Sequence, residues 1–287
     1  MTARTAAALA APAVALVTLT AVACSRGESR PAHDGPRTPR APVPHDVTLP
    51  GLAASRPAYA VRPAADAGRV TGTVRLEGPA PADTVVTPSA DDARACGRSL
   101  RIPAVEGQGG GVAGAVVWLV GVAAGKPLPA VRRAELALTG CRLQPRAVAA
   151  VAGGALNVHG VDALDARLRF TQVEGGAGDS TAGTVLLRVA TTDAGQVVPS
   201  ERVVAAPGTV EARGEAQPWL RAWVLAFDHP YFAVTDAAGA FALDGVPPGT
   251  YQLVAWHDRL GRAAQTVTVT PGQAAAVTVS LTAGAGR

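Results

Sequence analysis

The chain has 287 residues, of which 48% are hydrophobic, 4% aromatic and 17% charged, and its formal net charge is +4. Lys126 is the only lysine, so the positive charge comes almost entirely from arginine. No run of five or more basic residues occurs, which excludes the concentrated electrostatic footprint typical of nucleic-acid-binding proteins. We therefore expect no nucleic-acid partner.

Residues 1–23 are typical of a signal peptide for export. Arg4 gives a short basic region, an apolar stretch follows, and Ala21-Val22-Ala23 is a small-residue cleavage site directly before Cys24. A cysteine at this point resembles a lipoprotein signal, in which the thiol is acylated and holds the chain on a membrane. Ordinary cleavage that leaves Cys24 as a free thiol is the alternative. The sequence predicts an exported, membrane-anchored lipoprotein at the periplasmic or extracellular face.

Residues 24–67 are expected to form a disordered, proline-rich tether. They hold eight prolines, charges of both signs and almost no apolar periodicity. Such a segment cannot bury enough apolar surface to fold by itself.

From Gly68 onward the sequence predicts an all-β fold. Val70–Leu76 and Ala276–Leu281 alternate with period two, as half-buried strands do. Val116–Val120 is a continuous apolar run, which indicates a strand that is covered on both sides. No segment sustains a helical period with caps at both ends.

The last third of the chain places characteristic turns between such strands. Thr235–Phe241 reads TDAAGAF and Val246–Leu253 reads VPPGTYQL, where proline and glycine suit tight turns. These motifs resemble the carboxypeptidase-regulatory-like, transthyretin-type sandwich over residues 228–283. That domain type opens with a GxVxGxV strand, as at 68–74, and continues with one like GAVVWLVG, found at 114–121.

The resemblance implies a nested domain order. Residues 68–121 and 228–283 would share one regulatory-like sandwich, and residues 122–227 would form an inserted domain. A tandem order is the alternative. Contact between the strands at 70–76 and 276–281 distinguishes the two, because only the nested order brings them together.

Residues 217–261 also resemble a family of bacterial envelope proteins that are cupredoxin-like and methylamine-utilisation-like. This resemblance implies that residues 122–227 form a degenerate cupredoxin-like Greek-key sandwich. Family members typically bind copper through a cysteine and an HPWM motif just before DHPYFAVTD, which stands here at 228–236. The matching positions in this chain are occupied by Gly214, Gln217, Pro218, Trp219 and Leu220.

The first copper ligands of that family lie in a segment like LEVRNSDxxxHNxH, which matches residues 156–169. Ala166 and Arg169 occupy the two histidine positions. A blue-copper site needs two imidazoles and a thiolate, usually with an axial thioether, so the sequence predicts no bound metal and no cofactor. The remaining histidines of the folded part, His159, His229 and His257, are interpreted as structural. Metal or copper redox chemistry through other ligands is kept as a second alternative.

Two cysteines remain once Cys24 is assigned to the signal. Cys96 and Cys141 are an even pair in an oxidising compartment, and the resembled family often has cysteines at the matching positions. We predict a disulfide between them, with two unpaired thiols as the alternative.

Enzyme signatures are weak throughout the chain. Gly178-Asp179-Ser180 resembles a serine-hydrolase nucleophile only over three residues and has no defined partner histidine. There is no HExxH, no phosphate-binding glycine loop opening a helix, and no clear carboxylate pair. We expect no enzymatic activity.

The placement of the few aromatic residues bears on ligand binding. Trp118 and Trp223 are expected in the core, whereas Trp219, Tyr231 and Trp256 are candidates for a ligand-binding platform. The alternative interpretation is that Trp219 fills the space of the lost metal.

The sequence therefore favours a non-enzymatic cell-envelope lipoprotein. It would act as a binding or structural accessory module, and its partner would be an unidentified envelope protein or surface glycan. A carbohydrate-binding, starch-binding-like surface module is the first alternative. It requires the candidate aromatic residues to face solvent.

Overall fold

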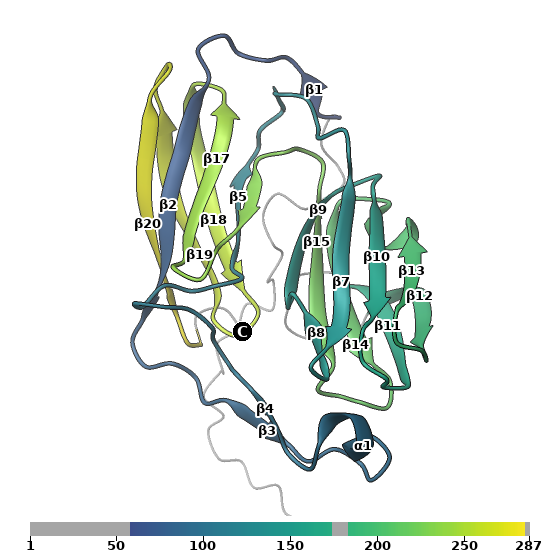
Figure 1. Cartoon of the computed structure of the whole chain (residues 1–287). Helices are drawn as coiled ribbons and strands as arrows, with labels where there is room; N and C mark the ends of the chain where they lie inside the picture. Colours follow the sequence, from purple (N-terminus) through teal and green to yellow (C-terminus); the bar gives the residue numbers. More distant parts are fainter. Residues whose placement is uncertain (1–57, 174–182, 285–287) are drawn as a thin grey trace, which may run out of the picture. The chain divides into compact units, whose positions relative to one another are not determined.

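The computed structural model describes residues 58–173 and 183–284, and these form almost entirely β-strands (Figure 1). The predicted all-β class is thus confirmed. The predicted signal peptide, Cys24 and Gly178-Asp179-Ser180 lie outside the described residues, as do residues 24–57 of the predicted tether. Within the described ranges, no helix is long and apolar enough to cross a membrane.

The first sandwich consists of a four-stranded and a three-stranded sheet. The four-stranded sheet has the order β16 (Phe232–Val234), β5 (Val116–Val120), β18 (Gly249–His257), β19 (Gly261–Val269). The three-stranded sheet has the order β17 (Ala240–Val246), β2 (Gly68–Glu77), β20 (Ala274–Thr282). Inward-facing residues of both sheets, among them Val70, Leu119 and Val279, form its core.

The second sandwich is built from strands that lie between β5 and β16 in the sequence. Its four-stranded sheet has the order β13 (Gln196–Ser200), β10 (Ala155–Gly160), β7 (Arg133–Thr139), β8 (Arg142–Gln144). Its five-stranded sheet has the order β12 (Gly183–Thr191), β11 (Ala166–Val173), β14 (Gly208–Gly214), β15 (Arg221–Phe227), β9 (Ala147–Val151). Leu136, Leu156 and Phe170 are among its core residues.

Strands β2 and β20 run parallel and pair from Arg69 opposite Ala274 to Glu77 opposite Thr282. This is the contact that distinguishes a nested from a tandem order. The first sandwich therefore takes its strands from two stretches of chain that are far apart in sequence. The second sandwich is formed by the chain between them, as the colours of Figure 1 show.

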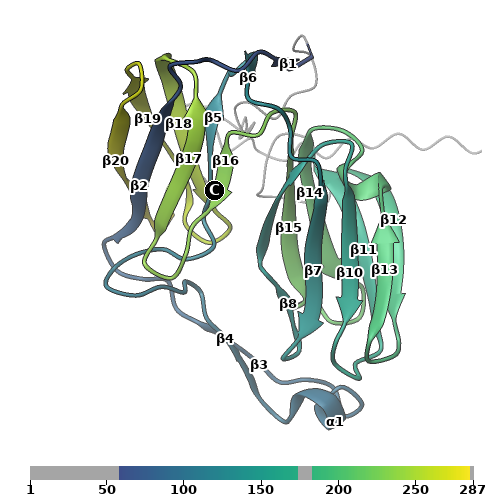
Figure 2. The same ribbon diagram turned by 45° about the horizontal axis from the view of Figure 1, so that its top comes forward.

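A small element group lies outside the two sandwiches. β3 (Thr84–Val86) pairs with β4 (Leu100–Ile102) in a hairpin that contains the short helix α1 (Ala93–Cys96). The hairpin interrupts the chain between β2 and β5 and is drawn at the lower end of Figure 2. A single 3₁₀ turn, Arg202–Val204, follows β13.

The tether boundary predicted from the sequence is wrong at its C-terminal end. β1 (Ala60–Val61) pairs in parallel with β6 (Ala124–Gly125). The Tyr59 hydroxyl donates a hydrogen bond to the carbonyl of Lys126 at 2.6 Å, and its ring packs edge-on against Tyr231. Backbone pairing and a packed aromatic ring compensate for the loss of chain entropy here, so residues 58–67 belong to the folded part.

The two sandwiches share an apolar interface. The first contributes side chains from β5 and β18, and the second contributes side chains from β9, β11 and β15. We call this group the interface cluster. Its buried members are Val116, Trp118, Ala147, Val173, Trp223, Leu225, Phe227, Val254 and Trp256.

Candidate functional site

The positions that match the copper ligands of the resembled family have structural contacts. Leu220 and Ala166 are fully buried in the core of the second sandwich. Gln217 is also buried, and its Nε2 donates hydrogen bonds to Asp92 Oδ1 at 2.9 Å and to the carbonyl of Asp165 at 3.2 Å. Among the described residues, no group of three or more His, Cys, Asp or Glu side chains is placed to hold a metal ion.

The aromatic platform suggested by the sequence is wrong for Tyr231 and Trp256, whereas Trp219 lines the cleft described below. Tyr231 and Trp256 are 0% and 2% exposed. The Tyr231 hydroxyl donates to the carbonyl of Gly245 and accepts from the N–H of Lys126. Trp219 is half-buried, and its indole N–H donates to the carbonyl of Cys141 at 3.2 Å. These contacts favour the alternative in which Trp219 fills space, and they count against the starch-binding-like alternative.

The histidines outside the tether have local partners. His159 Nε2 lies 2.5 Å from Oε2 of Glu135, between β10 and β7. His229 is buried, and its Nδ1 accepts a hydrogen bond from the N–H of Tyr231 at 3.2 Å. His257 ends β18 and lies in a cleft described next.

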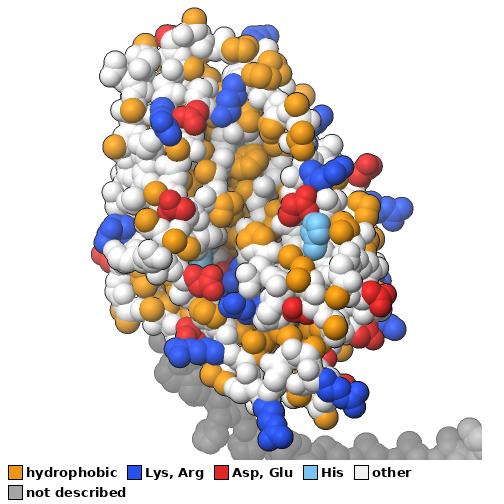
Figure 3. Space-filling model, viewed as in Figure 1, with side chains coloured by type: hydrophobic (Ala, Val, Ile, Leu, Met, Phe, Trp, Pro, Cys, Tyr) orange, Lys and Arg blue, Asp and Glu red, His pale blue; other side chains and the backbone are white. Residues whose placement is uncertain are grey.

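A cleft of about 240 Å³ lies between the two sandwiches and the β3–β4 hairpin. Basic and acidic side chains meet along the seam between the sandwiches, beside apolar ones (Figure 3). The lining comprises Thr84, Ile102, Glu106, Ala113, Gly114, Arg142, Leu143, Gln144, Arg146, Arg213, Pro218, Trp219, Arg221, His257, Asp258 and Arg259.

Positive charge dominates this cleft. Its lining includes five arginines against two carboxylates, Glu106 and Asp258. Arginine stays protonated under all conditions relevant to a folded protein. The cleft therefore has an excess of positive charge, which suits an anion.

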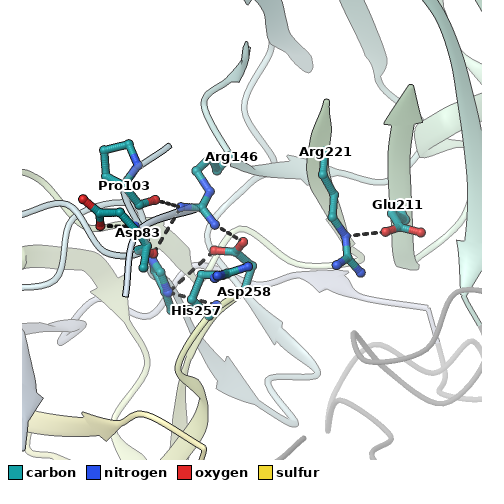
Figure 4. A network of polar contacts seen from close by, with 9 residues as sticks. Asp83, Pro103, Arg146, Glu211, Arg221, His257 and Asp258 are labelled. Atoms are coloured by element: carbon teal, nitrogen blue, oxygen red, sulfur yellow. Dashed lines mark hydrogen bonds and ion pairs between the residues drawn. The ribbon is translucent and has the colours of Figure 1, made fainter. Parts of the chain in front are cut away.

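Arg146 connects three parts of the chain at the centre of the cleft (Figure 4). It forms an ion pair with Asp258 in the β18–β19 turn. Its Nη1 donates to the carbonyls of Pro103 at 2.7 Å and Ala104 at 3.1 Å, just after β4. The Arg146 and Asp258 side chains are 23% and 9% exposed, so this ion pair holds the cleft walls together in a partly dry environment.

Glu211 positions two further arginines. Its carboxylate is 3% exposed and forms ion pairs with Arg213, at 3.4 Å, and with Arg221 on the neighbouring strand. The Arg221 guanidinium also lies over the Trp223 ring, 4.8 Å from its centroid. Each guanidinium has five N–H donors, and one shared carboxylate cannot engage all of them. Donors on both arginines are therefore available to a ligand.

His257 is held neutral in this setting. Burial lowers its pKa to about 4; the Asp258 carboxylate raises the pKa, whereas the guanidiniums of Arg146 and Arg259 lower it. Its Nδ1 accepts a hydrogen bond from the N–H of Arg259 at 3.2 Å. At neutral pH the imidazole adds no charge to the cleft.

The pKa of His257 predicts a loss of stability in acid. An unfolded chain protonates histidine below a pKa of about 6.5, whereas folded His257 remains neutral down to about pH 4. The unfolded state therefore binds more protons between these values, and stability should fall by up to about 3 kcal/mol as the pH drops through this window. Urea unfolding at pH 7 and pH 4.5 measures the fall.

His257→Asn should show a flatter pH dependence, because it removes the titrating group but keeps an acceptor near the N–H of Arg259. At pH 8 the imidazole is neutral in both the folded and the unfolded state. The difference in the free energy of unfolding between the variant and the native protein at this pH therefore measures lost packing alone. If the free energy of unfolding fell equally in the two proteins between pH 7 and 4.5, the loss of stability in acid would not come from His257.

Sequence reasoning did not identify the arginines of the cleft. The sequence contains one local indication of them. Glu211 and Arg213 are two residues apart in the segment GTVEARG, and Arg221 begins the otherwise apolar segment RAWVLAF. Charged residues at such positions need partners, but the sequence does not show that these two strands pair or that Asp258 approaches Arg146.

Comparison with known families supports the fold. Residues 184–282 match the family model of the carboxypeptidase regulatory-like domain. The match begins in β12 of the second sandwich and ends in β20 of the first, so it covers parts of both. The motifs at 235–241 and 246–253 lie inside it.

Other comparisons add little. No curated protein matches this chain. Among solved structures, a Cu-containing nitrite reductase (NirK) from Thermus scotoductus SA-01 is similar at 13% sequence identity and a TM-score of 0.25. The similarity covers 39% of this chain and 25% of that one.

Proposed function

We propose that this protein is a non-enzymatic binding module of the cell envelope, anchored through a lipid on Cys24, and that the arginine-lined cleft binds an anionic ligand. The observation that carries the proposal is the excess of arginine over carboxylate in the cleft: five arginines against the lining carboxylates Glu106 and Asp258 and the buried Glu211 beside them, among the described residues. The envelope location rests on the export signal and on the cysteine that follows the cleavage site.

The chemistry of the guanidinium group favours a carboxylate or a phosphate group as the ligand. Its planar fork donates two parallel hydrogen bonds to such groups. Arg213 and Arg221 share the single carboxylate of Glu211. No described residue forms an ion pair with the Arg259 guanidinium. An anion would therefore complete the coordination of these side chains.

The lining of the cleft supports binding rather than catalysis. Among the described residues that line it there is no cysteine or serine, and Thr84 supplies the only hydroxyl group. His257 lacks a free Nδ1, because the N–H of Arg259 already bonds to it. A general base with a pKa of about 4 is also poorly matched to neutral pH.

The proposal also takes the second sandwich as a cupredoxin-like domain without copper, related to the methylamine-utilisation-like envelope proteins. It is supported by the residues at the matching positions. Ala166 and Leu220 pack into the core, and Gln217 bonds to Asp92. None of these side chains offers a thiolate or an imidazole.

The test is calorimetric titration of the mature chain in detergent with galacturonate, inorganic phosphate and uncharged galactose. We expect at least one anion to bind and galactose not to bind. Arg221→Gln keeps the length and polarity of the side chain but removes its charge, and it should weaken anion binding by about 10- to 100-fold. Arg69→Gln, on β2 of the first sandwich, is the matched control and should bind normally. No anion binding, or equal loss in both variants, would overturn the proposal.

A further inference from the structure

Four arginines lie directly opposite one another across four neighbouring strands. In the five-stranded sheet, Arg188 of β12 pairs with Arg169 of β11, Arg169 pairs with Arg213 of β14, and Arg213 pairs with Arg221 of β15. Residues paired in register project from the same face of a sheet. These four residues, here called the arginine row, therefore form one line of guanidinium groups across the strands.

The arginine row continues out of the cleft. Arg213 and Arg221 line the cleft, and their side chains are 37% and 35% exposed. Arg169 is half-buried, and the side chain of Arg188, at the far end, is 62% exposed. The row thus leads from the cleft to the open surface of the second sandwich.

Folding alone does not account for this row. Like charges directly opposite one another on a sheet are destabilising. Among the described residues, two carboxylates compensate the four arginines: Glu211 contacts Arg213 and Arg221, and Glu215 contacts Arg188 at 3.0 Å. In the described part of the chain, Arg169 has neither an ion-pair nor a hydrogen-bond partner for its guanidinium. The row therefore retains positive charge that an external anion would neutralise.

We propose that the arginine row binds an acidic glycan, a linear sugar chain with a carboxylate or sulfate group on successive units. The inference rests on the proposed function, because one unit of the glycan would occupy the cleft. Neighbouring strands are about 4.8 Å apart, so the row presents charges at regular intervals over roughly 14 Å. A single small anion cannot contact all four arginines, whereas an extended polyanion can.

A nucleic acid fits this surface less well. Single-stranded nucleic acids need aromatic side chains on which bases stack. The four strands of the row contain three aromatic residues, Phe170, Trp223 and Phe227, and all three are buried. Charge without a stacking surface favours a sugar chain over a base-bearing one.

The test measures binding of the mature full-length chain, in detergent, to polygalacturonate, its monomer galacturonate, dextran sulfate and uncharged dextran. We expect polygalacturonate or dextran sulfate to bind at least 10-fold more tightly than galacturonate, and dextran not to bind. The tighter of the two polymers identifies carboxylate or sulfate as the recognised group. A double variant, Arg169→Gln with Arg188→Gln, should bind the polymer no more tightly than galacturonate. Its affinity for galacturonate should equal that of the native protein.

The matched control is Arg69→Gln with Arg75→Gln, which removes two exposed arginines from β2 of the first sandwich. Both double variants have the same net charge, so a loss confined to the row variant cannot come from overall charge. The row variant should also unfold at about the same temperature, because relief of like-charge repulsion offsets the loss of the exposed ion pair between Arg188 and Glu215.

Three results would overturn the inference: a polymer that binds no more tightly than galacturonate, an equal loss in both double variants, or tighter binding of a single-stranded oligonucleotide than of either glycan. If galacturonate binds in the first case, the cleft proposal survives without the row. If no anion binds at all, both proposals fail.

Discussion

Replacing Trp223 by alanine is expected to lower the free energy of unfolding by about 3–5 kcal/mol, the usual cost of removing a buried indole. Trp223 is 2% exposed and belongs to the interface cluster. Its ring meets Trp256 of the first sandwich edge-on, with centroids 5.9 Å apart and an interplanar angle of 81°. The cavity would therefore open between the two sandwiches, where neither core can collapse to fill it.

Urea unfolding followed by circular dichroism measures this effect without relying on tryptophan fluorescence. Trp223→Phe is the matched control. It keeps an aromatic ring and removes an indole N–H that has no acceptor among the described residues, so its cost should be near 1 kcal/mol, in the range of modest core substitutions. A loss below about 1 kcal/mol for the alanine variant would mean that the interface contributes little to stability.

Much of the fold was predictable because its signals are local. The alternation at 70–76 falls within β2, and that at 276–281 falls within β20. The apolar run Val116–Val120 coincides with β5, which is covered on one face by the core of its own sandwich and on the other by the interface cluster. The alternation of apolar and polar residues and the residues that form turns are properties of short segments. They can therefore be identified without knowledge of the rest of the chain.

One error, the exposure expected for Trp256, arose where one sandwich covers another. Trp256 belongs to β18, and its side chain packs into the interface cluster rather than the core of the first sandwich. On an isolated sandwich that face would meet solvent, as the platform hypothesis assumed. The second sandwich covers it instead. Burial of Trp256 is thus set by domain packing, which leaves no periodic trace in the sequence.

The candidate site was hidden for a related reason. Arg146 and Asp258 are 112 residues apart in sequence, yet they form the ion pair at the centre of the cleft. In the sequence, Arg169 stands at the position of a histidine of the resembled family, and nothing there relates it to the other arginines. Its place in the arginine row depends on the pairing of β11 with both β12 and β14. Strand order and register create both features, and neither is encoded locally.

Replacing Cys96 and Cys141 together by serine is expected to lower the free energy of unfolding by about 4 kcal/mol, the chain-entropy value for a loop of this length. The predicted disulfide is present, and its cysteines are 45 residues apart. It ties α1, within the β3–β4 hairpin, to the turn between β7 and β8 of the second sandwich. Without it, the unfolded chain regains the freedom of this loop.

Reduction provides the control for this prediction. Dithiothreitol should lower the stability of the native protein to that of the double serine variant and leave the variant unchanged. An unfolding midpoint of the native protein that does not respond to reduction would contradict the prediction. The hairpin also contributes Thr84 and Ile102 to the cleft, and Gln217 still holds it through Asp92 when the disulfide is absent. Anion affinity should therefore fall less than stability, because the disulfide acts mainly on the unfolded state.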